Sequence, residues 1–75
     1  MEQGKRHKEK AEYFLQNDIK AFIKDKDNNF YFCDILVVGE THLFIHNFAG
    51  KRIGEKQQIL WIDIELISEY RENGK

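Results

Sequence analysis

The sequence lacks proline entirely and contains one cysteine, Cys33, among its 75 residues. A single cysteine excludes an intramolecular disulfide, which suits a reducing compartment. Without proline, the chain lacks one common means of protecting the edge strands of a β-sheet. The charged amino terminus shows no secretory pattern, and no run approaches the roughly 18 apolar residues that a membrane span requires. We therefore expect a soluble cytoplasmic protein with no membrane partner.

The net charge is also small, with a formal value of −1. No global basic field therefore indicates nucleic acid. The charges are uneven, because basic residues gather at 5–10 and 51–56 while the carboxyl end is acidic. This asymmetry could orient a partner, or it could be an ordinary solvated surface. The length predicts a single domain over residues 1–75 with a modest core, and the 41% hydrophobic content favours oligomerisation.

The first expected element is a helix over residues 5–16. His7, Ala11, Phe14 and Leu15 share one face at helical spacing, and the intervening residues are polar. A helix of about three turns is marginal in isolation. Its apolar face is therefore expected to dock on the sheet that follows.

Five strands are expected, over residues 19–25, 30–38, 41–47, 58–62 and 64–70. The polar run 26–29 predicts a hairpin turn with a residue at positive φ. The imperfect alternation within 30–38 predicts burial on both faces or a bulge, and Gly39 is expected to supply positive φ to the next turn. The last two strands are expected to be interrupted near Asp63, and the spacing of Ile64 and Ile67, three residues apart, predicts a single helical turn or a bulge between them. A helix over 59–70 competes there, but the density of Ile and Trp favours strand.

Hairpin connections without a crossover helix exclude a parallel sheet. The fold class is thus mainly β: an amino-terminal helix followed by a five-stranded, strongly bent antiparallel barrel. The run FYFCDILVVGETHLFI from Phe30, then NFAGK and ILWIDIELISEY, resembles the Sm-like (LSm) family, with the general SH3-like barrel as the fallback. The resemblance implies an RNA-associated protein that forms rings of six or seven subunits through strands 58–62 and 64–70.

The residues that bind RNA in that family are only partly matched here. His42 stands where the resemblance places a base-binding Asn, and Leu60 and Trp61 stand where it places Arg-Gly. Cys33 stands where the family has a glycine at the bend of its second strand. The resemblance therefore supports the barrel more strongly than the uridine pocket.

Candidate RNA contacts lie on the third strand and the loop after it. Aromatic and imidazole rings can stack on bases, and cations can contact phosphate. The set comprises His42, Phe44, His46, Asn47, Lys51 and Arg52. A half-exposed strand face and a solvated turn remain the alternatives. We expect no metal site, because two histidines fall short of three or four ligands. The loop also lacks the spacing of a phosphate-cradling P-loop.

Candidate interface residues lie near the carboxyl end, where apolar side chains crowd the last two expected strands. They are Leu60, Trp61, Ile62, Ile64 and Leu66. We expect no enzyme and no cofactor, because no nucleophile–base constellation is present and Cys33 lies in an apolar run. Two hypotheses follow. One is a non-catalytic, oligomeric RNA-binding protein of the Sm-like type. The other is a protein-interaction or assembly module that keeps the barrel but has no RNA pocket.

Overall fold

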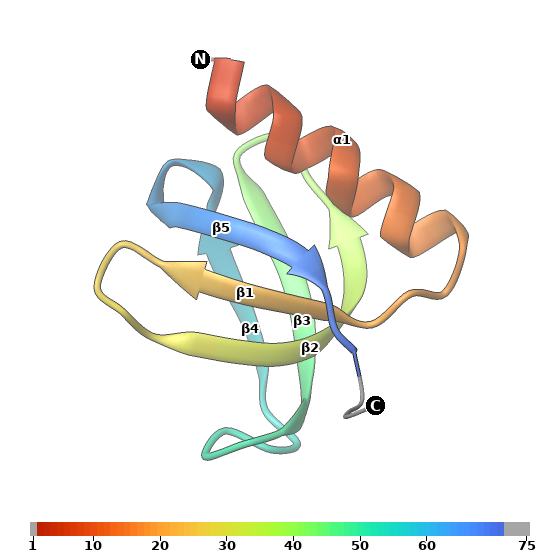
Figure 1. Ribbon diagram of the computed structural model, residues 1–75, viewed down its shortest axis with the longest axis vertical. Coiled ribbons are helices and arrows are strands. Elements are labelled where there is room, and N and C mark those ends of the chain that lie inside the picture. Colours follow the sequence, from red (N-terminus) through yellow and green to blue (C-terminus); the bar gives the residue numbers. More distant parts are fainter. Residues whose placement is uncertain (1, 72–75) are drawn as a thin grey trace.

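The computed structural model describes residues 2–71 and contains one helix and one five-stranded sheet (Figure 1). All strand pairs are antiparallel, so the mainly β class with an amino-terminal helix is confirmed. The elements in chain order are α1 (Glu2–Gln16), β1 (Ala21–Asp25), β2 (Phe30–Val38), β3 (His42–Ala49), β4 (Lys56–Leu60), the 3-10 helix η1 (Trp61–Asp63) and β5 (Ile64–Glu69).

Helix α1 begins at Glu2, three residues before the expected start, and ends at Gln16. It lies across the top of the sheet in Figure 1, where it packs on β2, β5 and η1. Ala11 and Phe14 supply its buried contacts. Burial of these two side chains provides the tertiary packing that a helix of this length needs. Residues 2–71 contain no helix that is long and apolar enough to cross a membrane.

A Schellman motif ends α1 and turns the chain toward β1. Asp18 takes the left-handed conformation, with φ of 56°, that glycine more often occupies. The backbone N–H of Ile19 donates to the carbonyl of Phe14 at 2.9 Å, and that of Asp18 donates to Leu15 at 3.4 Å. Ile19 then packs against the core, so β1 starts at Ala21 and not at residue 19 as expected.

The sheet has the strand order β4-β3-β2-β1-β5, and it curls so that β3 and β4 pass behind the other three strands (Figure 1). Among residues 2–71, β4 pairs only with β3, and β5 pairs only with β1. The expected barrel is therefore not closed. The sheet stays open because η1 separates β4 from β5 and these two strands, at opposite edges of the sheet, do not pair with each other in residues 2–71.

The pairing of β2 with β3 shifts its register at two places, which confirms the predicted irregularity of residues 30–38. Ile35 pairs with Ile45 and Val37 pairs with Phe44, so Leu36 is an extra residue on β2. The second shift lies between Phe32 and Cys33. Extra residues of this kind bend a strand and increase its twist, which accounts for the curled sheet.

The chain between β4 and β5 differs from the expected strand over 58–62. β4 ends at Leu60, and η1 replaces the last two residues of that strand. The indole N–H of Trp61 donates to the carbonyl of Gly39 at 3.0 Å, and its backbone N–H donates to Thr41 at 3.1 Å. These bonds fasten η1 to the turn between β2 and β3.

Gly39 has a role different from the one predicted. Its φ is not positive; instead a Cβ at this position would lie 2.9 Å from the carbonyl oxygen of His42. Glycine is therefore required for close approach of the backbone. The predicted positive φ in the first hairpin is confirmed at Asn28, where φ is 66°.

The inner face of the curled sheet forms the core together with α1 and η1. Alternation places Ala21, Ile23, Cys33, Leu43 and Ile45 on this face. The other buried hydrophobic residues are Ala11, Phe14, Tyr31, Ile35, Ile59, Trp61, Ile64 and Ile67. The opposite, outer face of the sheet is not covered by the helix, and it carries the side chains that alternate with the core residues.

His7 gives folding a specific pH dependence. It lies on α1 with its Nδ1 buried and without a hydrogen-bond partner in the described residues. Burial, followed by the charge of Lys10, lowers its pKa. The unfolded chain therefore takes up the proton first, near pH 6.5, so the free energy of unfolding should fall as pH drops below about 6.5. In His7→Gln this decrease should be smaller in urea unfolding measured between about pH 7.5 and 5.5. Equal pH dependence in both proteins would contradict the assignment.

Candidate nucleic-acid interface

The structure divides the six residues predicted to contact RNA into two groups. His42, Phe44 and His46 alternate along the outer face of β3 and are partly exposed. The rings of His42 and Phe44 lie 6.2 Å apart, and His42 Nδ1 lies 2.7 Å from the hydroxyl of Thr41. His42 and Phe44 stand at the end of β3 opposite to the loop that carries Lys51 and Arg52. The structure therefore does not bring the predicted set into one site.

The second group contributes to a groove of about 560 Å³ between the β1–β2 hairpin and the β3–β4 loop. Asn47, Lys51 and Arg52 line it, together with residues that the sequence analysis did not single out. These additional lining residues are Phe22, Asn28, Asn29, Phe30, Phe32, Ala49 and Gly50. None of the described residues that line the groove is acidic.

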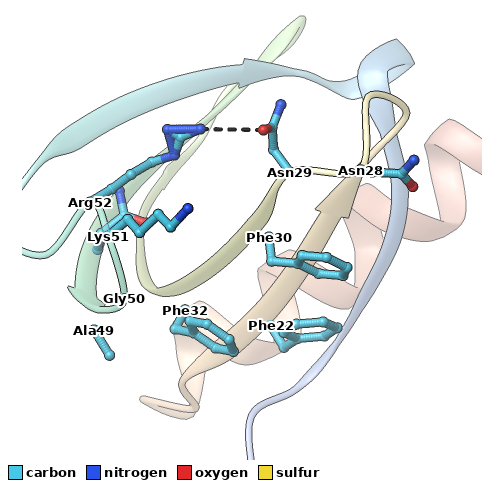
Figure 2. A pocket seen from close by; sticks show the side chains of 10 residues that line it. Phe22, Asn28, Asn29, Phe30, Phe32, Ala49, Gly50, Lys51 and Arg52 are labelled. Atoms are coloured by element: carbon cyan, nitrogen blue, oxygen red, sulfur yellow. Dashed lines mark hydrogen bonds between the residues drawn. The ribbon is translucent and has the colours of Figure 1, made fainter.

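Three phenylalanines form one wall of the groove (Figure 2). Phe22 of β1 stacks on Phe30 of β2, with ring centroids 5.6 Å apart and an interplanar angle of 18°. Phe22 also lies 5.5 Å from Phe32, its partner across the strand pair. Phe30 is 51% exposed. The row thus offers a flat aromatic surface to the solvent.

The aromatic row continues beyond the groove. Phe32 packs edge-on against Tyr70 at 5.8 Å, and Tyr70 packs against Phe48 at 5.1 Å. The ammonium of Lys20 lies 4.9 Å above the ring of Phe48, and it also bonds Asp34 at 3.1 Å. A continuous line of aromatic rings therefore runs across the outer face of the sheet, with Lys20 beside the end at Phe48.

Lys51 and Arg52 stand opposite the phenylalanines, on the loop after β3 (Figure 2). The Arg52 guanidinium donates to Oδ1 of Asn29 at 3.4 Å and lies 5.3 Å above the ring of Tyr31. Gly50 supports this loop with φ of 88°, a conformation that side chains rarely adopt. The groove thus combines an aromatic wall with a cationic rim.

Asp25 organises the hairpin side of the groove. This carboxylate is only 7% exposed and accepts hydrogen bonds from the backbone N–H groups of Asp27 and Asn29, both at 2.9 Å. It also accepts from Nδ2 of Asn29 at 3.1 Å and from the hydroxyl of Tyr31 at 3.0 Å. Burial alone would raise the pKa of Asp25, but these hydrogen bonds favour the charged form and lower it. Burial and the bond to Asp25 raise the pKa of Tyr31.

Asn47 organises the loop side and is only 1% exposed, although it lines the groove. Its Nδ2 donates to the carbonyl of Glu55 at 3.1 Å and to Oε1 of Gln57 at 2.9 Å. Its Oδ1 is buried and has no partner among the described residues. Buried acceptors of this kind are normally satisfied, so Oδ1 is a place for water or for a donor of a bound ligand.

The predicted interface residues also fall into two groups. Trp61 and Ile64 are buried in the core, whereas Leu60, Ile62 and Leu66 are exposed. The exposed three lie along β4, η1 and β5, where the sheet ends. The apolar pattern singled out these five residues, but it could not show which of them are buried. That depends on the course of the chain through η1, which strand alternation does not describe.

Cysteine and metal chemistry receive no geometric support in residues 2–71. Cys33 is buried, and this burial, followed by the charge of Asp34, raises its pKa to about 12. Its thiolate, which is the nucleophilic form, is therefore scarce at neutral pH. Within the described residues, no group of three or more His, Cys, Asp or Glu side chains could hold a metal ion.

The sequence analysis missed the phenylalanine wall, although a signal for it was present. Phe22 falls on the polar side of the alternation in β1, between Lys20 and Lys24. A single surface aromatic is ordinary, but Phe22 lies across the hairpin from Phe30 and Phe32, and a contiguous exposed apolar patch of this kind is a sign of a binding surface. Comparisons with known protein families, with curated proteins and with solved structures find no match for this chain.

Removing the Asp25 carboxylate should destabilise the protein. In Asp25→Ala, the Tyr31 hydroxyl and the amide of Asn29 lose a charged acceptor in a partly buried place. We expect the free energy of unfolding to fall by about 3 kcal/mol, measured by denaturant titration. Asp27→Ala is the matched control, because only the backbone of Asp27 takes part in the network, and it should change stability by less than about 0.5 kcal/mol. Equal effects of the two substitutions would contradict this account.

Proposed function

We propose that the protein is a non-catalytic, single-stranded RNA-binding protein and that the groove is its binding surface. The observation that carries the proposal is the pairing of three adjacent phenylalanines, each at least partly exposed, with Lys51 and Arg52 across one groove. Single-stranded nucleic acid presents flat bases and anionic phosphates side by side. Proteins that bind it combine aromatic platforms with a positive groove.

The charge of the groove favours this ligand over an apolar peptide. Its lining residues within the described chain include two cations and no carboxylate. A duplex would hide its bases inside the helix, so an exposed aromatic row offers it little. The net charge of the whole chain is near neutral, so attraction for the RNA phosphates is expected to come from local clusters of cations such as this rim.

The Sm-like resemblance is compatible with this proposal, but it would place the RNA elsewhere. It points to the turn between β2 and β3, around His42, whereas the groove lies at the opposite end of β3. The residues on which the proposal rests are therefore Phe22, Phe30, Phe32, Lys51 and Arg52. His42, Phe44 and His46 would contribute only if a longer strand crossed the outer face.

Removing one aromatic ring should weaken RNA binding. Phe30→Ala should raise the dissociation constant for short labelled oligo-U or oligo-A by roughly 5- to 100-fold, since base stacking on one aromatic contributes about 1–3 kcal/mol. Fluorescence anisotropy in ~50 mM salt measures it. Tyr13→Ala is the matched control, because Tyr13 is 58% exposed but lies on α1. Absence of binding by the parent to oligo-U, oligo-A and structured RNA would refute the proposal.

A second candidate function, assembly, has an observation of its own. The sheet is open, and β4 and β5 each pair on one side only. Leu60, Ile62 and Leu66 are exposed along these edges, and Ile62 is 70% exposed. An unprotected edge with apolar neighbours can pair with another chain. We propose self-association through these edges; a ring is the arrangement that the resemblance implies.

The solution molar mass tests assembly. Light scattering during gel filtration should give a multiple of the 9.0 kDa chain mass. Ile62→Lys should shift the protein toward the monomer, because a charge would then be buried in the contact. Ile53→Lys, on the exposed β3–β4 loop, is the control and should leave the mass unchanged. A parent protein that is monomeric at all concentrations would exclude this candidate.

A further inference from the structure

Arg52 has no acidic partner in the described chain, although it is held in place. The ion pairs found there join Lys8 to Glu40, Lys20 to Asp34 and Lys24 to Glu65. The contacts of Arg52 are instead with neutral groups, the amide oxygen of Asn29 and the ring face of Tyr31. Its positive charge is therefore not neutralised and remains available to an anion in the groove.

The orientation of the Asn29 amide is fixed by its other bonds. A carboxylate only accepts hydrogen bonds, so Asn29 must present Nδ2 to Asp25, and it does so at 3.1 Å. The amide oxygen is then directed to the opposite side, where Arg52 donates to it. The backbone N–H of Asn29 is also bonded to Asp25, at 2.9 Å. The support under Arg52 is thus anchored at two points.

Tyr31 provides the second support. Its ring is buried, its hydroxyl donates to Asp25 at 3.0 Å, and the guanidinium of Arg52 lies over its face. A planar guanidinium stacks favourably on an aromatic ring while its N–H groups remain free to donate sideways. Both supports of Arg52 therefore lead back to one buried carboxylate, which does not itself line the groove.

We propose that Arg52 is a pre-positioned phosphate subsite of the groove and that Asn29 and Asp25 are its positioning residues. This inference rests on the proposed RNA-binding function. The guanidinium fork matches the oxygens of a phosphate, and holding it in place beforehand reduces the side-chain entropy lost on binding. The phenylalanine wall of the same groove then receives the base. The subsite takes a nucleotide phosphate, from an RNA strand or from a free mononucleotide.

A double-mutant cycle tests the positioning role. Arg52→Gln should weaken oligo-U binding and reduce the slope of log K against log salt by about 0.7, because one phosphate contact is lost. Asn29→Ala keeps the charge, so it should weaken binding by about 2- to 10-fold without that loss of slope. In the Arg52→Gln background, Asn29→Ala should have no further effect, because Asn29 acts through Arg52.

Controls separate positioning from general damage. Asn28→Gly is the matched control: Asn28 also lines the groove, makes no bond to Arg52, and has a positive φ that glycine accepts. It should leave the salt slope and the coupling unchanged. If Asn29→Ala fails to fold, as judged by thermal unfolding, Tyr31→Phe serves in its place. This substitution keeps the ring under Arg52 and removes only the hydrogen bond to Asp25. It should weaken oligo-U binding less than Asn29→Ala does, and it should have no effect in the Arg52→Gln background.

The outcomes distinguish the two proposals. Additive effects of Asn29→Ala and Arg52→Gln in a parent that binds RNA would overturn the positioning role and leave the RNA-binding proposal intact. A parent that binds no RNA and no UMP would overturn both. If UMP displaces labelled oligo-U from the parent protein, the subsite accepts the phosphate of a free nucleotide. If only unlabelled oligo-U displaces it, the subsite is specific for the phosphate of an RNA backbone.

Discussion

A single short helix can cover only one opening of a curled sheet, and the remaining features of this protein follow from that constraint. Helix α1 closes the core over β2, β5 and η1, and it leaves the outer face of the sheet in solvent. Among residues 2–71, no second layer covers Phe22, Phe30 or Phe32. In the same part of the chain, β4 and β5 each have one unpaired edge. The candidate ligand surface and the candidate assembly surface therefore have one origin.

Asp25 connects the stability of the fold to the geometry of the groove. Its carboxylate collects four hydrogen bonds from the hairpin and from Tyr31, so the turn at residues 26–29 has one well-defined conformation. Through Asn29 and Tyr31 that conformation reaches Arg52, a residue on a different loop. A substitution at Asp25 would therefore alter folding and the site together, which is why the separate variants at Asn29 and Arg52 are informative.

Local patterns predicted most of the elements, and long-range geometry accounts for what they missed. Alternation at Ala21, Ile23 and Cys33 predicted the inner face, and broken alternation predicted the irregular β2. The expected closure into a barrel was wrong, and the pattern could not show this, because strand pairing and the bond from the Trp61 indole to the carbonyl of Gly39, 22 residues apart, are long-range contacts. The groove escaped prediction for the same reason: it forms only where the first hairpin meets the loop after β3. Pattern alone likewise could not show that Asn47 is buried.

The hydrogen bond from Trp61 to Gly39 has an optical consequence. Trp61 is the one tryptophan in the sequence, so the ultraviolet emission of the native chain is dominated by an indole that is buried. That indole is fastened to the turn between β2 and β3 and does not line the groove. Emission should therefore shift to the red when η1 detaches, and stay nearly constant when the groove is filled. The chain contains a natural fluorophore for unfolding that is separate from its candidate ligand surface.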